Sequence, residues 1–332
     1  RSSAGLKFIL YSFGGGLILL LAILGLYVQG GQTFDLVTLS DYEFNTSTQY
    51  WLFLAFFLAF AIKVPMIPFH AWLPGAYAES PTAGSVILAG ALSKMGAYGL
   101  LRVCLPLFPE AAIYFASFIL WLSIAAIIYG GLMALAQTDI KKLVAYSSIS
   151  HMGFVTLGIF VFNSQGIQGA VLQMFNHGII TAALFISVGQ LYDRTHSRAI
   201  SNYGGLHKPM PRFVALFTLF SVATFGLPGT SNFIGEFLVL VGTSYVSFAM
   251  VLISMGGVLL AAAYMLWMLQ RLVLGEPSTE AAKMLPDLSN RELAPLIPLA
   301  ILVLCIGLYP GPLMEMMDAS VIHLIQQTTG LQ

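Results

Sequence analysis

Five ionisable side chains lie inside long apolar stretches of this sequence. They are Lys63, Lys94, His151, His177 and Glu236. Even on a lenient insertion scale, a charge at the centre of a bilayer costs about 2.5–3.5 kcal/mol, so each of them requires an explanation. Lysine, histidine and glutamate exchange protons, and the sequence around them shows no catalytic triad, metal cluster or phosphate-binding loop. The pattern therefore predicts a path that moves protons or cations through changes of protonation.

The two lysines lie in different local surroundings. Lys63 is near the middle of its apolar run, and Pro65 and Pro68 then remove backbone donors, which predicts a break in the helix after the lysine. Lys94, in AGALSKMGAYG, has glycines on both sides, and these leave room for water or for a partner helix. A partly desolvated ammonium gives up its proton more readily, which suits a carrier. A salt bridge to a carboxylate on another helix is the structural alternative for Lys94.

The two histidines lie in consecutive apolar stretches. His151 follows two serines on the same side of its helix, and His177 shares a stripe with Gln173 and Thr181 at a spacing of four. Imidazole accepts a proton on one nitrogen while it donates from the other, so both residues are candidates for a relay. A lone buried histidine is more often a packed core residue. For His70, at the inner end of the broken helix, we favour a structural role over proton entry.

Glu236 is the one acid that we place inside the membrane. It lies near the end of the segment FGLPGTSNFIGEF, where glycines and a proline interrupt a second helical run. Two interrupted helices, each with an ionisable group beside the break, are typical of transporters built from inverted repeats, in which unwound backbone lines a watery cavity. Proline kinks that only help packing are the simpler alternative.

Composition predicts that helices position all these groups. The chain has 332 residues, of which 58% are hydrophobic and 8% charged, and its mean hydropathy is +0.86, whereas soluble domains carry roughly 25% charge. Continuous apolar runs exclude a β-barrel, whose segments would alternate. We therefore predict an all-α polytopic membrane protein with about nine spans of about 20 residues, two of them interrupted. The spans lie near 6–29, 51–70, 82–103, 111–136, 142–163, 166–192, 212–245, 246–272 and 292–311.

The charges are balanced in number and uneven in place. Fourteen Lys plus Arg match fourteen Asp plus Glu, which gives no indication of a nucleic-acid partner. If the first span starts inside, the outer side has little basic charge beyond Arg102, which predicts a cytoplasmic amino terminus, most simply in a bacterial plasma membrane. We expect Lys141 and Lys142 at the inner surface. The inner basic residues are Arg1, Lys141, Lys142, Arg194, Arg198, Lys208, Arg212, Arg271, Lys283 and Arg291.

The two cysteines predict no metal or redox site. Cys104 and Cys305 lie far apart in apolar stretches without a CxxC spacing, and we expect both to be buried and inert. The sequence has no iron–sulfur or haem pattern and no GxGxxG after a strand. We therefore expect no cofactor in this chain.

Four segments give the sequence a family resemblance. KVPMIPFHAWLPGAYAESPTAGSVILAGALSKMGAYGLLR, DIKKLVAYSSISHMGF, QMFNHGIITAALFISVGQLYDRTH and FGLPGTSNFIGEF resemble the antiporter-like membrane subunits of proton-pumping NADH:quinone oxidoreductase, respiratory complex I. The resemblance implies that Lys63, Lys94, His151, His177 and Glu236 form a proton relay driven by quinone reduction elsewhere in the complex. With a glutamate at position 236, the chain most resembles the branch of the family called subunit M or chain 4, because the sister subunits tend to have lysine at that position.

The resemblance also implies an organisation and partners. Within one membrane domain, 1–332, residues 1–103 would be the remainder of the first inverted repeat, 111–272 the second repeat, and 292–332 a final helix and tail. The first five helices of the family would precede this chain, including a glutamate that pairs with Lys63. The implied partners are neighbouring antiporter-like subunits, the lateral helix of the largest one and the lipid bilayer, and NAD, FMN, iron–sulfur clusters and quinone are expected in partner subunits.

Two other functions fit the same residues. One is a subunit of a multisubunit cation/proton antiporter or a membrane-bound hydrogenase. The other is a structural scaffold of the membrane arm that conducts nothing, and such a scaffold would be indifferent to the loss of Lys94 or Glu236.

Overall fold

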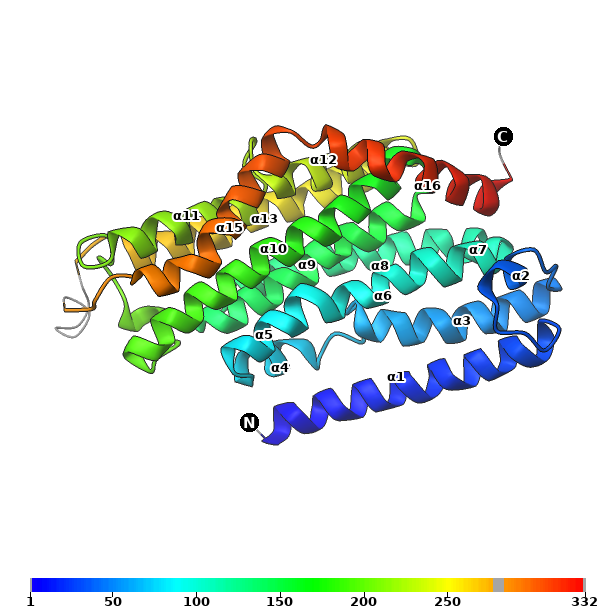
Figure 1. The fold of residues 1–332 in the computed structure, drawn as a ribbon, viewed down its shortest axis with the longest axis horizontal. Coiled ribbons are helices and arrows are strands. Elements are labelled where there is room, and N and C mark those ends of the chain that lie inside the picture. Colours follow the sequence, from blue (N-terminus) through cyan, green and yellow to red (C-terminus); the bar gives the residue numbers. More distant parts are fainter. Residues whose placement is uncertain (1, 277–283, 331–332) are drawn as a thin grey trace.

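The computed structural model describes residues 2–276 and 284–330, so Arg1 and Lys283 of the basic set lie outside it. Its helices run side by side along the longest dimension of the molecule (Figure 1). In this part of the chain the only β-pairing is an isolated bridge between Asp139 and Ala199. The helices are α1 (Ser2–Gln29), α2 (Leu36–Ser40), α3 (Thr46–Lys63), α4 (Leu73–Glu79), α5 (Thr82–Ile87), α6 (Ser93–Gly99), α7 (Leu105–Leu107), α8 (Pro109–Leu135), α9 (Ile140–Phe160), α10 (Ser164–Thr195), α11 (Pro211–Thr224), α12 (Ser231–Ser244), α13 (Phe248–Val273), α15 (Asn290–Leu308) and α16 (Gly311–Thr329), with π-helical η1 (Leu88–Leu92) and η2 (Leu100–Cys104) and the short 3-10 helix η3 (Ile200–Asn202).

The predicted all-α membrane architecture is confirmed. Among the described residues, seven continuous helical segments are long and apolar enough to cross a membrane. The other two expected spans are the interrupted ones, and each consists of two helical pieces. The seven segments are Ser2–Gln29, Thr82–Leu107, Pro109–Leu135, Ile140–Phe160, Ser164–Thr195, Phe248–Val273 and Asn290–Leu308.

The first break follows Lys63, as the two prolines predicted. Asn45 caps the start of α3 by accepting a hydrogen bond from the backbone N–H of Thr48, so the helix begins earlier than the apolar run. Helix α3 ends at Lys63, and the chain resumes as α4 at Leu73. The indole N–H of Trp72 donates to the carbonyl of Ile62 at 2.9 Å and so satisfies a carbonyl at the broken end. Lys63 therefore lies at the break, about halfway along residues 46–79.

The second break separates α11 from α12 and depends on glycine. Gly226 has a φ of +72° and Gly229 a φ of +92°, a backbone conformation that residues with a side chain rarely adopt. The N–H of Leu227 reaches back to Val222 O at 3.2 Å, so the turn satisfies part of the backbone that the helix gives up. This arrangement places Glu236 in the second turn of α12, just beyond the break.

A third irregularity surrounds Lys94, and the sequence did not predict it. Helix α6, which carries the lysine, lies between the π-helical turns η1 and η2. Such turns widen the helix and often occur at functional positions. Neighbouring helices approach α6 closely at its glycines. A Cβ atom on Gly96 would lie 2.8 Å from Phe60 O of α3, which confirms the prediction that small residues admit a partner helix.

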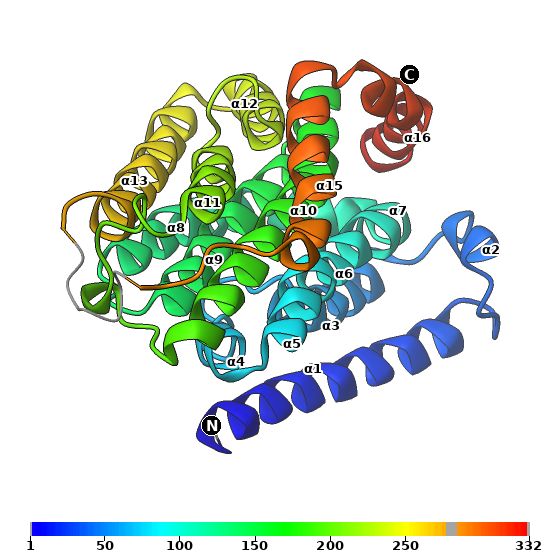
Figure 2. The ribbon, with the colours of Figure 1, turned by 60° about the vertical axis from the view of Figure 1, so that its left-hand side comes forward.

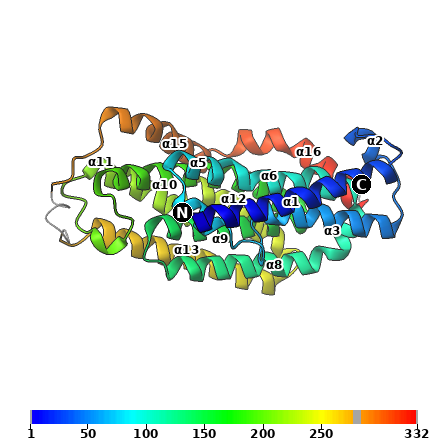
Figure 3. The ribbon, with the colours of Figure 1, turned by 90° about the horizontal axis from the view of Figure 1, so that it is seen from below.

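Helix α9 occupies the centre of the bundle and α1 its margin. Helix α9 packs against α4, α8, α10, α12 and α13. Helix α1 packs on α3 and α4 and otherwise stands apart from the bundle in Figure 2, whereas in Figure 3, seen from below, it lies in front of the other helices. The tail predicted after the last span is largely helical, since it forms α16. This helix packs against α7, α8 and α10.

The basic loops meet at one end of the bundle, where ion pairs neutralise part of their charge. Arg198 pairs with Glu79 at 3.0 Å and with Asp139 at 3.3 Å. Arg194 Nη1 pairs with Glu292 Oε1 at 2.7 Å and joins α10 to α15. The prediction that these basic residues gather at one end therefore agrees with the contacts between their loops.

One of the paired lysines was placed wrongly. Lys142 is exposed, but Lys141 is buried, and its ammonium donates to Ser80 O at 3.0 Å. Asp139 caps α9 through the N–H of Lys142, and consecutive residues of a helix face different directions, so the first lysine turns inward between α4 and α5.

The prediction for the cysteines was half correct. Cys104 is buried and Cys305 is exposed. The buried face of α15 is formed by Leu296, Ala300, Val303 and Gly307, which recur at helical spacing, and Cys305 lies off that stripe. Among the described residues no group of three His, Cys, Asp or Glu side chains could hold a metal ion.

Candidate functional site

Lys94 and His177 are in direct contact. The ammonium nitrogen of Lys94 lies 2.7 Å from Nδ1 of His177 and also donates to the carbonyl of Ala89 at 2.6 Å. Ala89 belongs to the π-helical turn η1, so the irregular turn supplies one of the two partners of the lysine. An imidazole thus takes the place of the carboxylate that a structural salt bridge would need. Lys94 also lines a cavity of about 500 Å³ with Gly90 and Gly178.

Two helices hold this contact in place. The carbonyl of Gly90 would lie 3.1 Å from a Cβ atom on Gly178, so α10 approaches the turn before Lys94 closely. A larger residue at Gly178 would push the helices apart and lengthen the contact between the lysine and His177, whereas a Cβ atom on Gly90 would meet Gly178 O at 3.8 Å, an ordinary contact. Gly178 therefore helps to set the distance between the two side chains.

His177 and His151 face each other across adjacent helices. Their ring centroids are 5.6 Å apart, with 41° between the ring planes. Both rings are almost completely buried. The two imidazoles have no direct hydrogen bond among those of the described residues, and a single water molecule or a small ring rotation would join them.

His151 is held between an acid and a phenol. Its Nδ1 lies 2.7 Å from Oε1 of Glu236, and its Nε2 lies 3.2 Å from the hydroxyl of Tyr264. The amide of Gln173 also donates to Oε1 of Glu236, at 2.9 Å. Glu236 is 3% exposed, so its carboxyl group depends on these partners rather than on bulk water. The second broken helix therefore carries an acid that is hydrogen-bonded to His151 and Gln173.

Lys63 is placed differently from the other four residues. It is half-buried at the end of α3, and no hydrogen bond or ion pair joins its ammonium to another described residue. It is nevertheless close to α6, since its Cβ would lie 2.9 Å from a Cβ atom on Gly96, two residues after Lys94. The structure brings together Lys94, His177, His151 and Glu236 and leaves Lys63 beside them.

The other polar residues of the predicted stripe have separate roles. The hydroxyl of Thr181 donates to the carbonyl of His177, and those of Ser147 and Ser148 donate to Val144 O. The ring of His70 packs edge-on against Tyr129, with centroids 5.0 Å apart. That contact agrees with a structural role for His70.

Sequence reasoning missed Tyr264 entirely. Its side chain is completely buried in α13, and its hydroxyl contacts His151. A tyrosine in an apolar helix is ordinary, but a buried hydroxyl usually finds a polar partner, and this requirement could have pointed to a neighbouring ionisable group. The role of Gln173 as a donor to Glu236 was also missed, although its place in the polar stripe was recognised.

Comparison with protein families gives an extensive match. Residues 1–262 match the family described as NADH:quinone oxidoreductase/Mrp antiporter, TM. NADH-quinone oxidoreductase subunit M of Rhodobacter capsulatus is 47% identical over 98% of this chain and 66% of its own length. NADH-ubiquinone oxidoreductase chain 4 of Chondrus crispus is 48% identical over 97% of this chain and 65% of its own length. The chain thus spans just under two thirds of the length of these curated relatives.

Solved structures match the fold closely. A chain of respiratory complex I from Thermus thermophilus with bound NADH superposes with a TM-score of 0.93, at 33% identity, over 99% of this chain and 70% of that one. A chain of the Mrp complex from Dietzia sp. DQ12-45-1b superposes with a TM-score of 0.89, at 20% identity, over 99% of this chain and 69% of that one. The second match, at its low identity, is a likeness of fold alone.

Proposed function

Because this chain belongs to the NADH:quinone oxidoreductase/Mrp antiporter membrane family, we propose that it is a proton-translocating membrane subunit of an NADH:quinone oxidoreductase. The observation that carries this proposal is the run of contacts from Lys94 through His177 and His151 to Glu236. Three of these four side chains are almost completely buried in a membrane-spanning bundle. Burial of this kind is costly and is typical of proton relays.

Each imidazole in the proposed path receives a proton on one nitrogen and releases one from the other. The Lys94 ammonium gives a proton to Nδ1 of His177, and the proton on Nε2 of His177 then leaves. His151 receives a proton on Nε2 and gives the one on Nδ1 to Glu236, whose Oε1 lies 2.7 Å away. At every transfer one N–H bond breaks and one N–H or O–H bond forms, so the relay moves charge without chemical conversion.

Lys63 acts in this proposal through its charge. It forms no hydrogen bond within the relay, but its Cβ lies close to Gly96 of α6, two residues after Lys94. Two ammonium groups on neighbouring helices repel each other, and the repulsion favours release of a proton from Lys94. A change in the surroundings of Lys63 would then change the proton affinity of Lys94.

The driving chemistry lies outside this chain in the proposed function. NAD, FMN, iron–sulfur clusters and quinone belong to partner subunits, and this chain contributes proton movement in the membrane arm. The identity of 47–48% to relatives named subunit M or chain 4 supports that assignment over a cation/proton antiporter subunit. A Glu236 partnered by His151 supports a working relay over a non-conducting scaffold.

The test replaces Lys94 in the intact assembly. Lys94→Ala removes the donor to His177, so we expect proton translocation to fall at least about tenfold, as for loss of a general acid. Vesicles containing the purified complex report proton uptake with a pH-sensitive dye while NADH oxidation is followed in parallel. Lys142→Ala removes an exposed lysine and serves as the matched control, with unchanged pumping.

Two results would contradict the proposal. An unchanged number of protons per electron in fully assembled Lys94→Ala would remove the lysine from the path and favour a scaffold. Proton exchange for sodium without any NADH-dependent pumping would assign the chain to an antiporter instead.

A further inference from the structure

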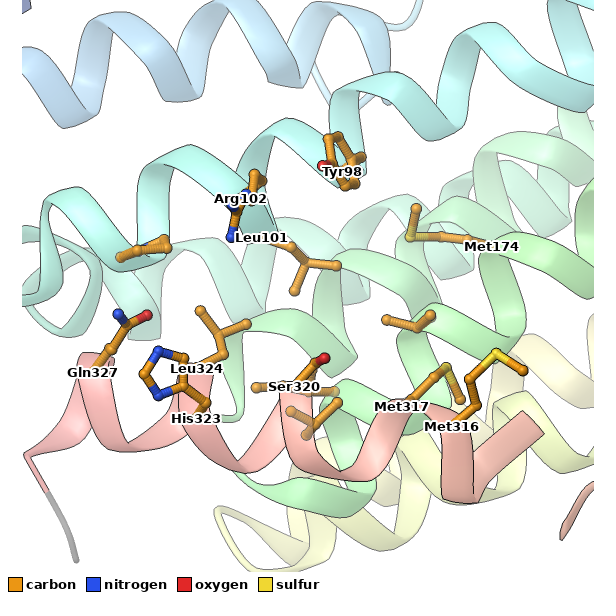
Figure 4. Close-up of a pocket in the computed structure, with 14 residues that line it drawn as sticks. Tyr98, Leu101, Arg102, Met174, Met316, Met317, Ser320, His323, Leu324 and Gln327 are labelled. Carbon is orange, nitrogen blue, oxygen red and sulfur yellow. The ribbon is translucent and has the colours of Figure 1, made fainter. Parts of the chain in front are cut away.

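A cavity of about 390 Å³ lies between η2, α10 and α16, and Val171 and Met174 line both this cavity and the one beside Lys94. It is at the end of the bundle that carries α2 and α7, opposite the basic loops (Figure 1). Figure 4 shows Met174 of α10 and Met317 of α16 along one part of its wall and Arg102, His323 and Gln327 along another. The wall is therefore apolar at one end and polar at the other.

Arg102 marks the polar end. Its side chain is exposed, and no ion pair or hydrogen bond joins its guanidinium to another described residue. A second cavity, of about 230 Å³, lies on the other side of this arginine and shares His323 and Gln327 with the first. Its lining adds Asp41, at the end of α2. Arg102 and Asp41 thus present opposite charges to this second cavity, and no ion pair joins them.

The position and the charges suit the head group of a lipid. Arginine binds phosphate oxygens through two parallel N–H donors, and an aspartate attracts an ammonium group. A phosphate linked to a primary amine would satisfy both residues at once, whereas a purely anionic head group would be repelled by Asp41. The apolar part, lined by methionines that adapt to irregular shapes, would take the first part of an acyl chain.

We propose that the groove under α16 binds one phospholipid with a zwitterionic, amine-bearing head group, its phosphate on Arg102, its ammonium on Asp41 and an acyl chain along Met174 and Met317. The head-group end of this site contains no residue of the proposed relay, so binding of the lipid does not depend on the proposed function. Occupation of the groove would hold α16 against the ends of α7 and α10.

The test measures lipid bound to the intact assembly. Native mass spectrometry of the complex, delipidated and then incubated with dioleoyl phosphatidylethanolamine, should show a bound lipid that Arg102→Gln loses and Arg102→Lys partly keeps. Lys142→Gln, which removes an exposed cation at the other end of the bundle, is the matched control. Dioleoyl phosphatidylglycerol, with the same acyl chains and no amine, should bind at least about tenfold more weakly, as expected for loss of a charged partner.

A second measurement keeps the proposal testable if an arginine variant fails to assemble. A photo-crosslinking amino acid at Met317, with Arg102 intact, should give an adduct with the mass of phosphatidylethanolamine. An adduct with protein would show that a polypeptide segment fills the groove and would overturn the proposal. Equal binding of the two lipids, or equal retention by Arg102→Gln and Lys142→Gln, would overturn it as well.

Discussion

The two broken helices use the same backbone device and give their ionisable residues different surroundings. Glu236, beyond the break between α11 and α12, is 3% exposed and accepts contacts from His151 and Gln173. Lys63, at the break between α3 and α4, is half-buried, and its ammonium bonds to no other described residue. One break holds an acid that is bonded into a network, and the other holds a base that is not.

This difference separates two ways in which a buried charge can take part in proton movement. A bonded group such as Glu236 can exchange a proton directly, because donor and acceptor are within hydrogen-bond distance. An unbonded charge such as Lys63 acts over a longer distance by changing the electrostatic potential at its neighbours. The two breaks should therefore respond differently when their charges are removed.

The largest effect is expected for Glu236→Gln. The amide cannot accept a proton from His151, so proton translocation should fall at least about tenfold. The shape of the side chain is kept, and Gln173 can still donate to its oxygen, which favours normal assembly. Glu315→Gln, at an exposed position of α16, is the control and should leave pumping unchanged in the same vesicle assay. Pumping at the control level in Glu236→Gln would place the relay elsewhere.

An intermediate effect is expected for Lys63→Gln. Removal of a nearby positive charge changes the proton affinity of Lys94 without breaking a bond of the relay, and a contribution of about 1 kcal/mol corresponds to a three- to tenfold loss of pumping rate. The loss should shrink as salt in the assay is raised, if water reaches the break. A complete loss, as in Glu236→Gln, would mean that Lys63 carries the proton itself and would erase the difference between the two breaks.

The smallest effect is expected for Tyr264→Phe. The variant loses one hydrogen bond to His151, which at 3.2 Å is long, and the neutral ring keeps its packing. With about 0.5 kcal/mol lost, pumping should decrease about twofold. Tyr309→Phe, at an exposed tyrosine, gives the baseline. Pumping by Tyr264→Phe at that baseline would show that the phenol only fills space.

Much of the site could be predicted because its residues conflict with their surroundings. Lys94, His151, His177 and Glu236 were recognised as ionisable groups in apolar helices, and the two breaks followed from proline and glycine. The order of contacts could not be predicted. That His177, not His151, touches Lys94 depends on how α10 packs on α6, and packing has no signature in a single sequence.

The misses have physical reasons of the same kind. The π-helical turns around Lys94 have the sequences LAGAL and LLRVC, and neither pattern distinguishes a π-helical turn from a regular α-helix. Lys141 looked superficial because it lies near a helix end, but its direction depends on the cap at Asp139. The helix α16 escaped notice because its apolar residues are interspersed with polar ones, so it does not form a continuous apolar run.

The burial of α9 has a consequence for leakage. Within the most apolar 18-residue stretch of α9, 94% is buried inside the protein, although the helix is apolar enough to face lipid. Protein therefore surrounds His151, and an excess proton on its imidazole ring would have no contact with the acyl chains. In the proposed relay, hydrogen ions would pass from His177 of α10 through His151 of α9 to Glu236 of α12 without contact with the acyl chains, so the surrounding membrane would keep its electrical resistance.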